Sequence, residues 1–161
     1  MAVDMFLKMA PVKGESQDSK HKEEIEILAW SWGMSQTGTT HHGTGGGAAK
    51  VSVQDLSFTH YVDKASADLF KACCSGQHFT EAMLTVRKAA GKDAIEYIKI
   101  KLSNIIITAV TTGGASGEEK LTENVTLNFQ KFHYNYTQQM PDGTPGAKPE
   151  FGWDMAMNKE W

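Results

Sequence analysis

Apolar side chains that recur at every second residue most limit what this chain can fold into. The period appears in Val3–Met9 and returns in Ala82–Val86, Val125–Phe129 and Phe151–Met157. Successive side chains of an extended chain point to opposite faces of a sheet, so this period predicts β-strands. Seven or more strands are expected along the chain.

Several of these strands change the parity of their apolar residues part-way. The switch falls near Ile27–Leu28 and again near Gln54–Asp55, and a third separates Phe129 from Phe132. A β-bulge produces such a switch because it adds one residue to one strand of a pair. Bulges also bend a sheet, which favours curved or closed β-structures.

One segment has the composition of a helix instead. Ser66 is a suitable N-terminal cap, the letters ADLFKACCS contain good helix formers, and Gly76 is a suitable stop. The spacing predicts a buried stripe made of Leu69, Phe70 and Cys73. We expect a single helix of about ten residues.

Many strands and one helix predict a mainly β fold, an antiparallel barrel or sandwich. The turn Ala90–Asp93 lies between two alternating runs and indicates a β-hairpin. A chain of 161 residues is expected to form one domain, residues 1–161, that buries a core without disulfide bonds.

The basic residues argue against a nucleic-acid partner. The net charge is −3, and Arg87 is the one arginine among 16 basic residues. Arginine is the preferred reader of phosphates and base edges because it donates two parallel hydrogen bonds. No nucleic-acid binding is therefore predicted.

Hydropathy predicts neither membrane insertion nor a signal peptide. No run approaches the roughly 18 apolar residues of a membrane helix. Asp4 and Lys8 interrupt the first apolar run, which breaks the uniform core that a signal peptide needs. The protein is expected to be made in the cytoplasm, and any export must use another route.

The stretch from Thr39 to Val53, TTHHGTGGGAAKVSV, resembles a ligand-binding loop at first sight. A phosphate-binding P-loop places its lysine directly after glycine, whereas Lys50 follows alanine. The looser dinucleotide form G-x-G-x-x-A does occur, but it requires a helix after it and VSVQDLSF predicts a strand. The glycines are better explained as a flexible connector, and no cofactor is predicted.

The remaining candidates for metal binding or catalysis lack supporting patterns. His41 and His42 are adjacent, so they point in opposite directions in an extended chain, and neither His60 nor His78 stands at zinc-ligand spacing. No G-x-S-x-G motif is present, and nothing supports pairing a cysteine with a distant histidine. We expect no metal and no enzyme activity.

Three carboxylates and two cysteines also have simple structural explanations. Asp55, Glu96 and Glu123 stand in strands, where alternation toward solvent explains them. The adjacent Cys73 and Cys74 project about 100° apart on a helix and indicate no disulfide framework. They are interpreted as small, partly buried residues in a reducing compartment, with a redox pair as the alternative.

Ser31 stands between Trp30 and Trp32 and has two interpretations. The simpler one is that the tryptophans enter the core and the serine faces water. The other is that the serine lies on a surface that the protein shares with partners. The residues alone leave both open.

Longer strings carry a family resemblance. They are LAWSWGMSQTGT (Leu28–Thr39), KVSVQDLSFTHYVDKAS (Lys50–Ser66), LTVRKAAGKDAIEYIKIKL (Leu84–Leu102) and TTGGASGEEKLTENVTLNF (Thr111–Phe129). With MAVDMFLKM at the start and FGWDM near the end, the chain resembles the Hcp family (haemolysin-coregulated proteins), tube subunits of bacterial type VI secretion. The resemblance runs from Met1 to about Met157.

The resemblance implies a fold and an assembly. The fold is an antiparallel two-sheet β-barrel with one short α-helix packed outside. Six copies form a ring, and rings stack into a tube inside a contractile sheath, with a spike protein at the tip. Small effector proteins ride in the lumen, and the tube itself is secreted without a signal peptide.

The resemblance also assigns roles to particular residues. Ser31 would face the lumen and contact effectors. The loop from Gln36 to Lys50 would touch a neighbouring ring or subunit. Its contact residues would be Thr40, His41, His42, Gly43, Thr44, Gly45, Gly46 and Gly47.

Three hypotheses remain from the sequence. The first is a self-assembling, non-enzymatic tube subunit and cargo carrier. The second is a monomeric β-barrel module that binds a small ligand or carbohydrate. The third is a metal-dependent enzyme that uses His41 or His42.

Overall fold

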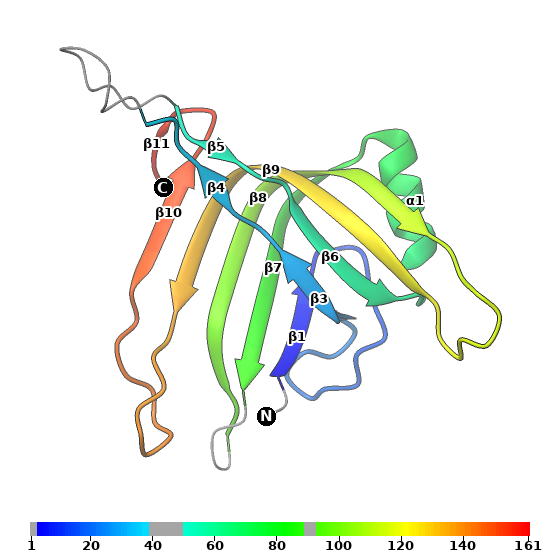
Figure 1. The fold of residues 1–161 in the computed structure, drawn as a ribbon, viewed down its shortest axis with the longest axis horizontal. Helices are drawn as coiled ribbons and strands as arrows, with labels where there is room; N and C mark the ends of the chain where they lie inside the picture. The colour runs from blue at the N-terminus through cyan, green and yellow to red at the C-terminus, as the bar shows by residue number, and fades with distance from the viewer. Residues whose placement is uncertain (1–2, 39–49, 89–92) are drawn as a thin grey trace.

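The computed structural model describes residues 3–38, 50–88 and 93–161, and within them it contains one α-helix among β-strands (Figure 1). In chain order the elements are β1 (Val3–Lys8), β2 (Ile25–Glu26), β3 (Ala29–Ser31), β4 (Met34–Ser35), β5 (Ser52–Val53), β6 (Leu56–Tyr61), α1 (Ser66–Ser75), β7 (His78–Lys88), β8 (Ile95–Thr112), β9 (Thr122–Tyr136), β10 (Glu150–Asp154) and β11 (Lys159–Glu160).

Strand β9 is the centre of the sheet. It pairs with β8 along most of its length, with β6 through its first half and with β10 through its second half. Beyond β8 the order continues through β7 and β1 to β2, and all of these pairs are antiparallel. The predicted hairpin is confirmed because β7 and β8 pair on either side of residues 89–92.

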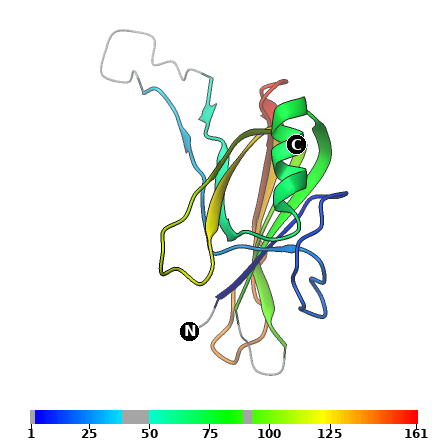
Figure 2. The same cartoon turned by 90° about the vertical axis from the view of Figure 1, so that its right-hand side faces the viewer.

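The strands form two layers with the core between them. Figure 2 shows β3 and β6 in one layer and β1, β7 and β8 in the other. The largest fully buried side chains come from both layers and, for Leu69, from α1: Phe58, Phe132, Leu7, Met9, Ile25, Leu56, Leu69, Leu84, Ile100, Leu102, Ile105 and Leu127. The mainly β, antiparallel class with one short helix is confirmed.

The two ends of the strand order are joined through the backbone of residues 25–31. The Ile27 amide donates to Met5 O on β1 (2.9 Å), and the next amide, Leu28, donates to Thr59 O on β6 (2.8 Å). The sequence predicts a β-bulge near Ile27–Leu28; the structure instead has two short strands there, and the chain changes its pairing partner from β1 to β6. A closed barrel is not detected among the described strands; one covalent segment bridges β1 and β6 instead.

Asn104 lies where the buried side chains of the long strand β8 change parity, so that both halves of the strand contribute to the core. In β8, Ile100 and Leu102 are buried before it, and Ile105 and Ile107 are buried after it, so the inward parity changes from even to odd. Asn104 has a φ of 54° at the change. Asparagine tolerates this left-handed conformation better than most residues, because its short amide hydrogen-bonds locally.

Helix α1 begins and ends where the sequence predicts, and it packs against β8. Gly76 ends it in the left-handed conformation, with a φ of 67°. The prediction that Ser66 caps the helix is wrong, because the N-cap position is Ala65 and no side chain caps it. Ser66 is instead the first helical residue, and its hydroxyl points inward.

The predicted buried stripe of α1 is partly wrong. Leu69 is fully buried and Cys73 is half-buried against the core, but Phe70 is 37% exposed. The buried stripe runs through Ser66, Leu69 and Ala72, three residues apart. Phe70 lies about 100° around the helix from Leu69 and so points away from β8.

Candidate functional site

One exposed face of the sheet is lined with short polar side chains. Across strands β3, β6, β9 and β8, Ser31 stands in register with Ser57, Ser57 with Thr126, and Thr126 with Ala109. We call this surface the polar face. Its residues are Ala29, Ser31, Asp55, Ser57, Thr59, Thr108, Ala109, Thr111, Asn124, Thr126 and Asn128.

Alternation explains why this surface is polar. On β6, Leu56, Phe58 and His60 point into the core, which leaves Ser57 and Thr59 on the outside. The same parity on β9 buries every second residue and exposes the amides and hydroxyls between them. The polar face is therefore the back of the core-forming surface of the same strands.

Hydrogen bonds between strands hold the side chains of the polar face. The Ser57 and Thr126 hydroxyls lie 3.2 Å apart, and Thr59 Oγ1 donates to Asn124 Oδ1 at 2.5 Å. Cross-strand pairs of this kind stabilise a sheet. The face thus presents donors and acceptors at fixed positions.

The structure places Ser31 as the sequence suggests. Ser31 is exposed, and its neighbours Trp30 and Trp32 are half-buried and pack against the core. The Trp32 ring meets the Phe132 ring edge-on, with 4.8 Å between the ring centroids. Sequence reasoning found the orientation of this serine, and its contact with a partner stays a prediction.

The residues predicted to contact a neighbouring ring, Thr40–Gly47, lie outside the described residues. Their flanks are described: Met34 pairs with Val53 and Ser35 with Ser52, which makes an antiparallel ribbon of β4 and β5. The ribbon rises away from the sheet on the side away from α1 (Figure 2). The prediction that the glycine-rich stretch joins two strands is confirmed at its base.

A buried polar cluster was missed by the sequence analysis. Glu123 was expected to face solvent, but it is 1% exposed and accepts a hydrogen bond from Ser66 Oγ at 2.6 Å. His60 is fully buried, and its Nε2 lies 2.8 Å from Glu123 Oε1. Parity was the available signal, since Glu123 shares the parity of the buried Val125 and His60 that of the buried Phe58.

The members of this cluster are tied to one another inside the protein. The Ser66 hydroxyl donates to the Glu123 carboxylate, and His60 and Glu123 are buried. The atoms are shielded from solvent by the core. Within residues 3–38, 50–88 and 93–161 no group of three or more histidine, cysteine or acidic side chains could hold a metal ion.

A second charged cluster fastens the segment after β1 to the sheet. Arg87 Nη2 donates to Asp18 Oδ2 at 2.6 Å and to Asp4 Oδ2 at 3.1 Å. The hydrogen bond from Arg87 holds the pKa of Asp18 well below its usual range, and the bond to Asp18 in turn raises the pKa of Arg87. The sequence marks residues 13–22 as a polar loop without indicating this anchor.

His21 also holds this segment against the sheet. Its two ring nitrogens face Glu24 Oε2 at 2.5 Å and Glu96 Oε1 at 2.8 Å, and its ring stacks on Phe6. Burial raises the pKa of Glu96, but hydrogen bonds and charges from Lys99 and His21 outweigh it and leave that pKa lowered. Glu96 is thus half-buried and ion-paired rather than simply solvent-facing.

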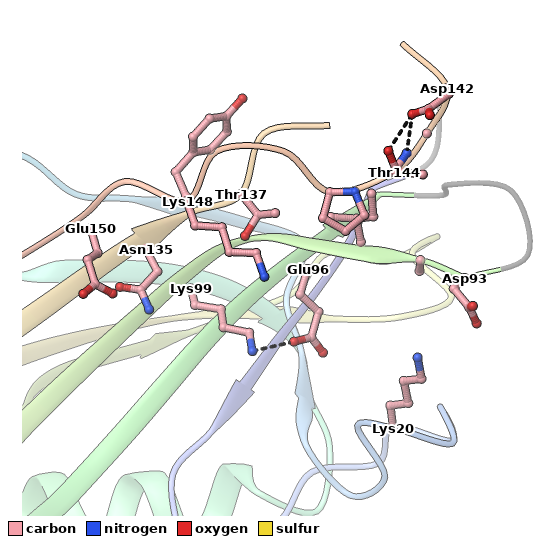
Figure 3. A pocket seen from close by; sticks show the side chains of 15 residues that line it. Lys20, Asp93, Glu96, Lys99, Asn135, Thr137, Asp142, Thr144, Lys148 and Glu150 are labelled. Atoms are coloured by element: carbon pink, nitrogen blue, oxygen red, sulfur yellow. Dashed lines mark hydrogen bonds and ion pairs between the residues drawn. The ribbon is translucent and has the colours of Figure 1, made fainter. Parts of the chain in front are cut away.

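Among the described residues, a cleft of about 800 Å³ lies where β8 begins and the connector between β9 and β10 folds back (Figure 3). Lysines and carboxylates line it, and Lys99 Nζ pairs with Glu96 Oε2 at 2.8 Å. Small-molecule sites are usually mostly apolar with a few convergent polar groups. This cleft is therefore a poor match to the small-ligand hypothesis.

Comparisons with known proteins agree with the fold. The model of the family described as "Type VI secretion system effector, Hcp" matches residues 6–136. Protein hcp1 of Pseudomonas aeruginosa is 54% identical over 159 residues, which cover 98% of each chain. A crystal structure of Hcp1 from Salmonella typhimurium has a TM-score of 0.83 and 41% identity and covers 100% of both chains.

A further solved structure, described as a type six secretion system protein, has a TM-score of 0.93 at 29% identity and covers 99% of this chain and 100% of its own. The fold and these likenesses define the class: a component of bacterial type VI secretion. The chain belongs to the Hcp family, whose members are structural, secreted tube proteins of that system. Across the described residues, no helix is long and apolar enough to span a membrane.

Proposed function

We propose that this chain is a tube subunit that carries effector proteins against its polar face. Six copies close into a ring, rings stack into a tube, and Ser31 lines the lumen. A spike protein caps the tube and a contractile sheath surrounds it. The subunit acts by contact rather than by catalysis, and it leaves the cell without a signal peptide.

The observation that carries the proposal is the chemistry of the polar face. Its hydroxyl and amide groups offer many weak hydrogen bonds, and they are already held by cross-strand bonds such as Ser57 to Thr126. Such a surface retains varied proteins without the strong, specific bonds that would prevent their release. A ring places copies of this face around one lumen through heterologous contacts that close by rotation.

The first test concerns assembly. Native mass spectrometry of the purified full chain should show six-copy rings, and negative-stain microscopy should show stacks at high concentration. A monomer under both conditions would reject the tube and favour the ligand-binding module.

A deletion tests the glycine-rich loop. Deleting Gly43–Gly47 should leave the rings intact and impair stacking or secretion. Normal stacking together with normal secretion would show that the loop has no role in assembly.

The second test concerns cargo. Ser31→Gln puts a long side chain on the polar face, so we expect intact rings that co-purify with less cognate effector. Ser75→Gln is the matched control, because Ser75 is an exposed serine at the end of α1. Equal effector recovery from wild type and Ser31→Gln would refute a cargo role for this face.

A further inference from the structure

Asp55 differs from every other residue of the polar face in its charge. Around it the described side chains of that face are hydroxyls, amides and methyl groups. Asp55 lies at the break between β5 and β6, two residues before Ser57 and therefore on the same side of the chain as the row of Ser31. Asp55 is half-buried, so its carboxylate lies partly within the surface rather than fully in solvent.

Two neighbouring strands hold the Asp55 carboxylate in position. Asn128 Nδ2 on β9 donates to Oδ1 at 2.8 Å, and Thr108 Oγ1 on β8 donates to Oδ2 at 3.2 Å. Thr108 stands at the register shift between Ile107 and Ala109, and its hydroxyl proton is shared between Asp55 Oδ2 and the Thr126 carbonyl oxygen at 3.3 Å. The Asn128 amide is therefore the main contact that orients the carboxylate before a partner binds.

This carboxylate keeps acceptor capacity that the protein does not use. A carboxylate has about four lone-pair sites, and the two side-chain donors occupy two of them. In the described part of the chain, no lysine, arginine or histidine nitrogen lies within 4.0 Å of Asp55. Several other acidic groups, such as Asp18 and Glu96, have a cation beside them.

We propose that Asp55 is the cation-recognising point of the polar face and takes an arginine or lysine side chain of a bound protein. The proposal rests on the function proposed above, because the bound protein is the cargo in the lumen. A fixed carboxylate repels phosphates, so the occupant is a polypeptide with an exposed basic residue rather than a nucleic acid. In a six-copy ring the same group recurs six times around the lumen, which adds the weak contacts together.

The experiment measures binding of a fluorescein-labelled six-arginine peptide to purified rings by anisotropy, at about 50 and 300 mM salt. Asp55→Asn keeps the shape and removes the charge. We expect it to weaken binding about two- to fivefold at low salt, as for an exposed ion pair, and to flatten the salt dependence. A Gly-Ser peptide of equal length should bind both proteins alike.

Two controls separate recognition from general charge and from structure. Asp68→Asn makes the same charge change on an exposed residue of α1 and should leave peptide binding as in wild type. Thr108→Val removes one donor to Asp55 but keeps the charge, so most of the affinity and all of the salt dependence should remain. If Asp55 had only a structural role, Thr108→Val and Asp55→Asn would lower the peptide affinity equally.

The outcomes are distinguishable from failure of the proposed function. In one outcome, Ser31→Gln rings lose cargo while Asp55→Asn and Asp68→Asn rings bind the peptide equally well. That outcome would overturn the role of Asp55 and leave the carrier function intact. Absence of rings, or unchanged cargo with Ser31→Gln, would reject the function itself. Selective loss with Asp55→Asn alone supports the inference.

Discussion

Removing the Glu123 carboxylate should destabilise the protein more than any surface carboxylate does. In Glu123→Ala the fully buried His60 loses the oxygen 2.8 Å from its Nε2, and the Ser66 hydroxyl loses its acceptor at 2.6 Å. Leaving a buried polar group without its partner costs about 1–3 kcal/mol, and this change affects two such groups, the Ser66 hydroxyl and the His60 ring.

We therefore expect the free energy of unfolding to fall by about 3 kcal/mol, a large share of the roughly 5–15 kcal/mol typical of a domain. His60 Nε2 lies off the line of a hydrogen bond to Glu123, so the Ser66 hydrogen bond should contribute the larger part. Glu123→Gln keeps an oxygen for Ser66 and loses the charge, and it should cost about 1–2 kcal/mol.

The assay is urea denaturation followed by circular dichroism at one fixed protomer concentration, because assembly adds to apparent stability. Glu81→Ala is the control: Glu81 lies on the exposed side of β7 and pairs loosely with Lys101, at 3.7 Å. It should change stability by less than about 1 kcal/mol. The reasoning would be refuted if Glu123→Ala lowered the free energy of unfolding no more than Glu81→Ala does, with the same denaturant slope for both.

Three further predictions concern the anchored loop, the helix and one glycine. Because the hydrogen bond from Arg87 keeps the pKa of Asp18 low in the folded protein, its stabilisation is present above about pH 4, the unfolded value. It is lost as the pH falls from there toward the folded pKa, so Asp18→Asn should reduce the fall in the free energy of urea unfolding between about pH 5 and pH 2. Leu69→Ala should lower the free energy of unfolding by about 2–5 kcal/mol, and Phe70→Ala by clearly less; equal losses would contradict the observed helix orientation. Gly14→Ala should cost about 1–3 kcal/mol by thermal or urea unfolding, because a Cβ there would lie 2.6 Å from a facing carbonyl oxygen; a neutral result would contradict the tight approach.

The sequence predicts much of the fold because apolar residues alternate along most of its strands. The parity switches near Ile27–Leu28 and Gln54–Asp55 locate the irregularities, which are gaps between short strands rather than the bulges expected, and the helix is located by composition and Gly76. The partners of each strand do not follow, because pairing depends on contacts between residues far apart in the chain. The change of partner at Ile27 and Leu28, for example, is visible only in the folded backbone.

Sequence reasoning failed mainly to predict which charged side chains are buried and paired, and the reason is physical. A carboxylate in an alternating strand faces water unless another element supplies a partner, and that partner can be anywhere in the chain. Glu123 is buried because β6 brings His60 and α1 brings Ser66 beside it. Asp18 is held by Arg87, 69 residues away. Neither partnership has a local signature.

The same parity that buries Glu123 explains the character of the candidate site. On β9 the core takes every second residue, so the outer face consists of whatever stands between them, here short amides and hydroxyls. Larger apolar residues at those positions would make this face adhesive, and more charges would make it selective. The face instead combines short neutral groups with one carboxylate, Asp55, held by Asn128 and Thr108. The preference for cations that we propose for it rests on those two contacts between strands, and no sequence motif indicates them.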